Sequence, residues 1–225
     1  MSSRLIMEPM RIRAYLLDGR IAGTESWFPL DSILAAEWIR RHHPDKFYTP
    51  PPPGVKDGWI EADLPFALRG SEGRWYYACS FNVTEPLTEY ITYWHRRFDD
   101  VLERYIDFQG RRGKVDEKSG KYKAYRMPLN ILLLPWLEWF AVGHIKSVQS
   151  LCEGIPALGK KPAQGYGLVE RWEVAPWPED WSEAREGRLT RAVFELPAGV
   201  RGGRRRLYGM RPPYWRKQEE VWMPV

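Results

Sequence analysis

Residues 155–174 read IPALGKKPAQGYGLVERWEV, a glycine-rich loop that runs into a strand-like segment. Before the loop, residues 143–155 place four apolar side chains on one helical face: Ile145, Val148, Leu151 and Cys152. After the loop, alternating apolar residues predict a strand, with Leu168, Trp172 and Val174 on one face. The order helix, glycine loop, strand is the feature from which the rest of the chain is interpreted.

The N-terminal half supplies matching elements. Residues 10–23, MRIRAYLLDGRIAG, begin with period-two alternation, which predicts a first strand with Met10, Ile12, Ala14 and Leu16 facing inward. Between Pro29 and Pro44, the stretch PLDSILAAEWIRRHH predicts a helix. Residues 58–68 and 73–83 are rich in aromatic residues and predict a pair of strands, and strand character resumes at 124–143.

This element order predicts the fold class. Strand, helix, two strands, an insertion, strand, helix, loop and strand form the β-α-β-β-α-β plan of ferredoxin-like folds. We therefore predict an α+β, ferredoxin-like (RRM-like) domain at 1–175, interrupted by an insertion at about 84–125. The insertion begins with a charged, amphipathic stretch that we expect to be helical, followed by a basic segment. Residues 176–225 are expected to form a basic, aromatic C-terminal extension packed on the same domain.

Bulk composition limits the function class. With 225 residues and 44% hydrophobic composition, the chain is long and apolar enough for one domain with a packed core. No uninterrupted apolar stretch reaches the roughly 18 residues that a membrane helix needs, so we expect no membrane association. Only Cys79 and Cys152 are present, without the spacing of a disulfide framework or zinc site, which suits a reducing, cytoplasmic location.

Basic residues are clustered, although the formal net charge is only +5. Clustered Arg and Lys interleaved with Tyr and Trp suit a nucleic-acid groove, because cations meet phosphates and flat groups stack on bases. The alternative interpretation is a solvated basic surface, which at the C-terminus would be a strand pair. The candidate contacts in these clusters are Arg111, Arg112 and Lys114 in the insertion, and Arg204, Arg205, Arg206, Arg211, Tyr214 and Trp215 near the C-terminus.

The glycine loop does not match the motifs that hold small nucleotides. A Walker A loop needs Ser or Thr after its lysine and follows a strand, whereas Lys160 and Lys161 come early here and no Ser or Thr follows Gly165. The loop can instead present backbone N–H groups to a polynucleotide, with charge from its lysines. Gln164 adds hydrogen bonding and Tyr166 a stacking ring. Alternatively, the glycines only allow a tight turn.

The loop resembles the glycine-rich loop of the RAMP superfamily of CRISPR-associated proteins, most specifically at Gly159, Lys160, Gly165, Tyr166 and Gly167. Weaker similarity lies in PLDSILA, WFAVGHIKSVQSL and GMRPPYW, so that the resemblance spans residues 10–215. Within the superfamily, the chain is most similar to the subunit that caps the guide RNA's 5′ handle in type IV CRISPR effector complexes. It departs from the family at His144, where an acidic residue is frequent.

The resemblance implies a non-catalytic subunit that needs no cofactor. Lys160, Lys161, Gln164 and Tyr166 would engage the 5′ handle with the loop backbone, while guide–target pairing supplies sequence specificity. Four arginines could extend the groove: Arg11, Arg13, Arg40 and Arg41. The insertion would be a projecting thumb against the backbone subunit of the complex. A large or small subunit is a further expected partner, and target DNA is a possible ligand.

Two other functions remain open from the residues. A related metal-independent endoribonuclease would need a general base and acid, which His42 or His43 could supply with Tyr48 or Lys160. Cationic residues at a helix C-terminus also complement the helix dipole without any catalytic role. A structural subunit that binds mainly protein would use tryptophans such as Trp177 and Trp181 as interface anchors. No metal site is expected, because the carboxylate groups have the spacing of solvated faces.

Overall fold

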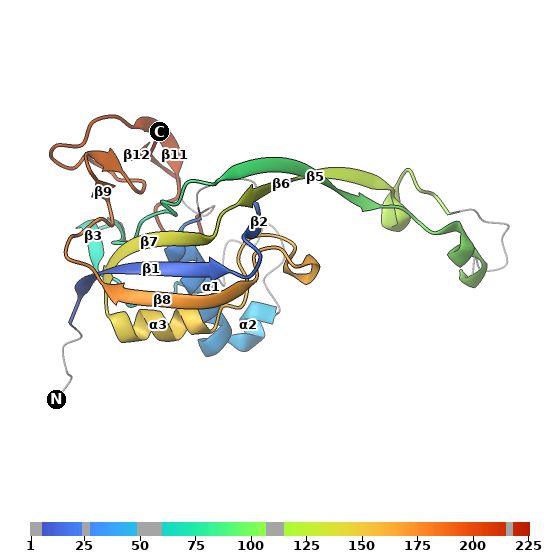
Figure 1. Ribbon diagram of the computed structural model, residues 1–225, viewed down its shortest axis with the longest axis horizontal. Coiled ribbons are helices and arrows are strands. Elements are labelled where there is room, and N and C mark those ends of the chain that lie inside the picture. The colour runs from blue at the N-terminus through green and yellow to red at the C-terminus, as the bar shows by residue number, and fades with distance from the viewer. Residues whose placement is uncertain (1–5, 24–27, 49–59, 107–114, 215–217) are drawn as a thin grey trace.

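The computed structural model describes residues 6–23, 28–48, 60–106, 115–214 and 218–225. The fold is mixed α and β with mostly antiparallel sheets. The central sheet has the order β7-β1-β8, in which β1 (Glu8–Leu16) pairs antiparallel with both β7 (Trp136–Gly143) and β8 (Val169–Pro176) (Figure 1). The first and last strands predicted from alternation are therefore confirmed.

An extended segment continues this sheet beyond β7. After the short hairpin of β3 (Leu68–Ser71) and β4 (Arg74–Tyr77), residues 78–83 run along β7. The backbone N–H of Ser80 donates to the carbonyl of Phe140 at 2.8 Å, and that of Val83 donates to the carbonyl of Glu138 at 2.9 Å. The strand predicted at 58–68 is wrong for residues 60–67, where only a single bridge forms at Phe66. Pro65 interrupts a ladder there because it has no N–H.

Two helices cover one face of the central sheet (Figure 1). They are α1 (Leu30–His42), which begins after Pro29 as predicted, and α3 (Ile145–Glu153); the short α2 (Pro44–Tyr48) follows α1. The inward face predicted for the first strand is confirmed, because Met10, Ile12, Ala14 and Leu16 are all buried. They pack in one core with Leu34, Trp139, Val148 and Leu151. Within the described ranges, no helix is long and apolar enough to cross a membrane.

The insertion is a long β-hairpin that projects from the body (Figure 1). Its strands are β5 (Thr88–Arg96) and β6 (Tyr125–Leu133), which pair along their whole length and join β2 (Arg20–Gly23) in the order β2-β6-β5. Two 3₁₀ turns lie further out, at Asp100–Tyr105 and Gly120–Tyr122. The prediction of a helix here is wrong for 88–96, where Thr, Tyr, Ile and Trp side chains favour a strand.

The hairpin is a continuation of the central sheet. β1 passes into β2 through a turn at Gly19, whose carbonyl accepts from the N–H of Leu134 at 2.7 Å. β6 passes into β7 across Pro135, whose carbonyl accepts from the N–H of Leu16 at 3.2 Å. The two connections lie side by side, one from β1 to β2 and one from β6 to β7. The projecting hairpin is therefore attached to the body through β1 and β7.

The C-terminal residues form small strand pairs around a second core cluster, which Tyr76 and Phe81 of the body share. β9 (Ala184–Arg185) pairs with β10 (Arg188–Leu189), and β11 (Arg204–Tyr208) pairs with β12 (Glu219–Met223). Arg191 is fully buried and ties this part to the body by donating to the carbonyls of Tyr77, Cys79 and Met210. The sequence allows two interpretations of the basic C-terminal stretch, a nucleic-acid contact or a strand pair with a solvated basic face. The pairing of β11 with β12 shows that the stretch forms a strand pair.

Candidate nucleic-acid interface

The glycine loop after α3 has a closely packed backbone. The N–H of Leu158 donates to the carbonyl of Gly167 at 2.8 Å, which closes the loop at its base. Gly167 has φ +67° and Gly159 has φ +76°, a region that glycine enters at little cost. A Cβ on Gly167 would lie 1.9 Å from the carbonyl oxygen of Leu158, and one on Gly159 would lie 2.5 Å from that of Ala22. Both glycines are therefore required by space as well as by conformation.

The loop is fastened to β2, at the point where the hairpin leaves the body. The N–H of Lys160 donates to the carbonyl of Ala22, and the N–H of Gly167 donates to that of Arg20, both at 2.7 Å. Between these anchors, Tyr166 packs against the small cluster of Ala22, Leu129 and Ile131. The loop thus lies across the β2-β6-β5 sheet, at the junction of body and hairpin.

The loop side chains differ in how available they are. Lys160 and Gln164 are exposed, whereas Lys161 and Tyr166 are half-buried. The Nζ of Lys161 lies 4.0 Å from the ring centroid of Trp94 on β5, and the guanidinium of Arg20 lies 5.5 Å from that of Tyr166. Neither lysine forms an ion pair with a carboxylate of the described residues, so both charges remain available to phosphates.

Trp94 and Arg20 belong to this site although the sequence did not indicate them. They are 67 and 141 residues before Lys161, and only the pairing of β5, β6 and β2 brings them to the loop. A period-two interpretation of TEYITYWHR at 88–96 would have placed Trp94 on the same face as Tyr90 and Thr92. That alternation is the one available signal.

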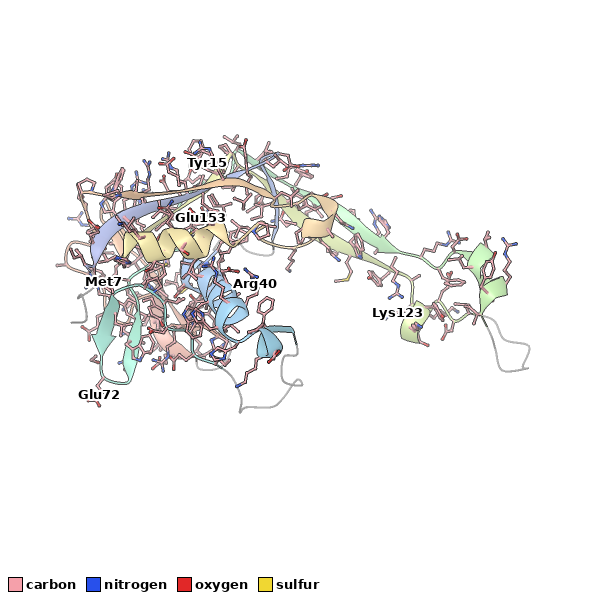
Figure 2. The ribbon with its side chains drawn as sticks, turned by 90° about the horizontal axis from the view of Figure 1, so that it is seen from below. Met7, Tyr15, Arg40, Glu72, Lys123 and Glu153 are labelled. Carbon is pink, nitrogen blue, oxygen red and sulfur yellow. The ribbon has the colours of Figure 1, made fainter. Side chains whose placement is uncertain are left out.

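Arg11 and Arg13 lie on the face of the central sheet that is opposite the helices. Tyr15 lies on the same face, and Figure 2 shows it on the other side of the strands from α3. Arg11 pairs with Glu173 at 2.5 Å, and Arg13 pairs with Glu138. Hydrogen bonds from Arg11 and Tyr15 hold the pKa of Glu173 below its usual value. These two arginines are therefore already compensated by carboxylates, unlike the loop lysines.

Arg40 and Arg41 end α1 beside the start of the glycine loop; Figure 2 labels Arg40 at this end of the helix. Both donate to the buried Glu37, and although burial raises the pKa of Glu37, these hydrogen bonds bring it below its usual value. Arg41 also donates to the carbonyl of Ser150 in α3 at 2.5 Å. A Cβ on Gly154 would lie 2.0 Å from Glu37 Oε1, so this network closely abuts the end of α3.

The two candidate catalytic histidines lie at the same end of α1 but face elsewhere. His42 Nδ1 lies 2.8 Å from the carbonyl oxygen of Trp38, and its ring stacks on that indole with centroids 4.3 Å apart. The ring of His43 is tilted against the same indole at 5.6 Å. His42 borders a groove of about 930 Å³ on the helical side, lined also by Trp75 and Lys146. Neither histidine has a contact with Lys160 among those that the described residues make, so neither is part of the loop site.

The C-terminal candidates are dispersed. Arg204, Arg205 and Arg206 are exposed on β11, where Arg205 pairs with Glu220 at 3.2 Å. Arg211 pairs with Glu61 at 3.3 Å and lies over Trp75, on the helical side of the molecule. The hydroxyl of Tyr214 donates to the buried Asp31. Tyr214 is thus held inside the fold in this conformation, and its predicted RNA contact is untested.

Four predicted contacts lie outside the described residues: Arg111, Arg112, Lys114 and Trp215. Trp177 and Trp181, proposed as protein-interface anchors, are half-buried and pack on each other and on Phe140, with ring centroids 4.8–5.5 Å apart. Among the described residues, no group of three or more His, Cys, Asp or Glu side chains is arranged to hold a metal ion.

Comparison with known proteins adds one finding to this geometry. A family model described as CRISPR type IV associated protein Csf3 matches residues 8–225, which is nearly the whole chain. A search of curated proteins found no match.

Proposed function

Because the chain belongs to the Csf3 family of CRISPR type IV associated proteins, we propose that it holds the 5′ handle of the guide RNA in a type IV effector complex and does not cleave it. The observation that carries this proposal is the glycine loop. It presents Lys160 and Lys161 without carboxylate partners among the described residues, beside two aromatic rings. Phosphates need cations, and splayed bases need rings.

We further interpret the body as a ferredoxin-like, RAMP-type domain. With residues 78–83 included, the extended segments lie in the spatial order β8, β1, β7 and 78–83. α1 follows β1, and α3 connects β7 to β8, so that the chain contains the strand–helix–strand–strand–helix–strand succession. In this interpretation the glycine loop precedes the last strand at the rim of the sheet.

The projecting hairpin is suited to an adjoining protein subunit. Several large apolar side chains on it are exposed: Tyr90, Ile91, Tyr93, Leu102, Tyr105 and Met127. Exposed apolar surface of this kind marks interaction sites. We propose that it contacts the backbone subunit of the complex; a large or small subunit and target DNA remain further proposed partners.

The histidine geometry favours binding without cleavage. A general base must reach the proton that it removes, within about 3 Å or through one water. His42 is engaged by its own helix and stacked on Trp38, on the side of α1 that borders the groove. The proposed RNA site at the loop lysines therefore has no histidine contact among the described residues.

The lysines of the loop are expected to dominate the salt dependence of RNA binding. The double variant Lys160→Ala/Lys161→Ala should bind labelled repeat RNA more weakly, with the slope of log K against log salt reduced by about 1.4, because each single-strand phosphate contact contributes roughly 0.7. The measurement is a gel-shift titration of the full chain at several salt concentrations, with chelator present.

The matched control is Lys46→Ala/Lys146→Ala, which removes the same charge from the helical side, where both lysines are exposed. Equal slopes in the two double variants would contradict the proposed site. Absence of any shift with the unaltered protein would favour a subunit that binds mainly protein. Cleavage products that disappear in His42→Ala/His43→Ala would favour the nuclease.

The arginines of β11 provide a second test. Changing Arg204, Arg205 and Arg206 together to Gln should flatten the salt dependence further if this exposed strand contacts the RNA. Because Arg205 already pairs with Glu220, the expected change in slope is about 1.4, for two available cations, and not the roughly 2.1 of three. An unchanged slope would assign β11 to the solvated surface.

A further inference from the structure

One aromatic ring within the glycine loop and one beside it are each covered by a cation. Lys161 covers Trp94 with its Nζ 4.0 Å from the ring centroid, and Arg20 covers Tyr166 at 5.5 Å. The two cations differ in their other partners. Arg20 is held by Asp18 at 2.6 Å, whereas Lys161 forms no ion pair within the described part of the chain. Of the two rings, Trp94 is therefore the one from which the cation can move away.

Trp94 is held in a fixed orientation. It lies on β5 opposite Met127 of β6, and its indole N–H donates to the hydroxyl of Tyr125 at 3.3 Å. Its side chain is half-buried, in contrast to the exposed neighbours Tyr93 and His95 on the opposite face of the strand. A ring that is anchored at its edge and covered on one face by a mobile type of side chain can present that face without refolding.

Lys161 has a fixed backbone and a long side chain. Its φ of 61° and ψ of 44° place it in the left-handed region, between Lys160, whose N–H is bonded to Ala22, and Pro162, whose ring fixes its own φ. Among the residues that the structure describes, the side chain has no carboxylate partner to leave when its Nζ moves from the Trp94 face. A strongly hydrated point charge on a flexible stem is well suited to follow a phosphate.

The exchange of partners is favourable for single-stranded RNA. A cation over a ring that is partly open to solvent is a weak contact, and base stacking on an aromatic side chain is stronger. An arriving nucleotide brings both a base for the ring and a phosphate for the ammonium. Nucleotide binding therefore replaces one weak contact by two stronger ones, which a protein surface without phosphates would not do.

Building on the proposed function, we propose that Trp94 is a stacking platform for one base of the guide RNA. Lys161 covers the platform in the free protein and moves to an adjacent phosphate when the base arrives. Tyr166 stays packed on Leu129 and Ile131 and forms the wall of the site on the other side of the loop. The platform reads no sequence, since every base has a face to stack, so this site positions one nucleotide at the junction of body and hairpin.

The test couples the ring to a single base. A series of repeat RNAs, each with one abasic nucleotide, is titrated against the full-length protein and against Trp94→Ala and Trp94→Phe. We expect one abasic position to weaken binding by the unaltered protein about tenfold, as loss of one stacked base predicts. For Trp94→Ala, the RNA with the abasic nucleotide at that position and the intact RNA should bind with equal affinity. Trp94→Phe should retain part of the effect.

The matched control is Tyr93→Ala, which removes the adjacent ring on the opposite face of β5, where Arg126 lies 3.7 Å from its centroid. This variant should keep the full abasic effect. An abasic effect of equal size in Trp94→Ala, or none at any position in the unaltered protein, would overturn the platform while leaving RNA binding by the loop intact. Failure of the unaltered protein to bind RNA would overturn the proposed function itself, and the platform with it. Thermal melting confirms that each variant is folded.

Discussion

Gly167→Ala is expected to weaken RNA binding more than tenfold and to lower the free energy of unfolding by several kcal/mol. Gly165→Ala should cost only about 1 kcal/mol and leave RNA affinity within about twofold. Both glycines have positive φ, +67° and +87°, so both substitutions carry the penalty of the left-handed region. Only at Gly167 does the new Cβ meet backbone, 1.9 Å from the carbonyl oxygen of Leu158; nothing lies within 4 Å of the Cβ position at Gly165.

The larger effect at Gly167 arises because relieving the clash opens the base of the loop. The N–H of Gly167 donates to the carbonyl of Arg20, and the carbonyl of Gly167 accepts from the N–H of Leu158. Separating these loop segments would displace Lys160 and Lys161 from the hairpin junction. Thermal melting and RNA titration of the two variants, side by side, make the measurement. Equal RNA affinities for the two proteins would show that the loop geometry does not matter for binding.

The elements that could be predicted from the sequence are those with one buried face. In β1 buried and half-buried residues alternate, and α3 buries one stripe, so their periods are visible in the residues. β5 is exposed or half-exposed along its whole length, since the hairpin leaves the body. Without a buried face the alternation of residues 88–96 is only a weak indication of a strand, and the charges at 85–104 favoured the wrong prediction of a helix. Pairing with β6 determines its structure.

The candidate site was predictable where it is local in sequence. The loop glycines and lysines were indicated by their composition and by the resemblance to CRISPR-associated proteins, which the family match confirms at the level of a type IV protein. What the loop contacts was not predictable, because Trp94 and Arg20 arrive through strand register. Register also gives Arg11 its partner Glu173, which is 162 residues away. Spacing along a chain carries no such information.

The C-terminal extension follows the same logic, because one of its attachments to the body is a buried charge. Asp31 at the start of α1 and Arg191 are both fully enclosed, and Tyr214 donates to Asp31. Burial raises the pKa of Asp31, and the positive charge of Arg191 opposes that rise. Arginine is rarely buried unless it is paired. The contact of Tyr214 with Asp31 and the burial of Arg191 follow only from the tertiary structure, so neither is visible in the sequence.

Arg191→Met is expected to lower the free energy of unfolding by about 3–5 kcal/mol, since it removes a buried, hydrogen-bonded positive charge that also opposes the rise in the pKa of Asp31. For a chain of this size, that corresponds to a decrease in Tm of roughly 10 °C. The variant also leaves the carbonyls of Tyr77, Cys79 and Met210 without this donor.

Arg205→Met, which removes an exposed arginine paired with Glu220, should change the unfolding free energy by less than about 1 kcal/mol. Adding Asp31→Asn to Arg191→Met should recover part of the loss, because the uncompensated carboxylate is then absent. Additive losses in the double variant, measured by chemical denaturation at neutral pH, would show that Asp31 and Arg191 do not act on each other.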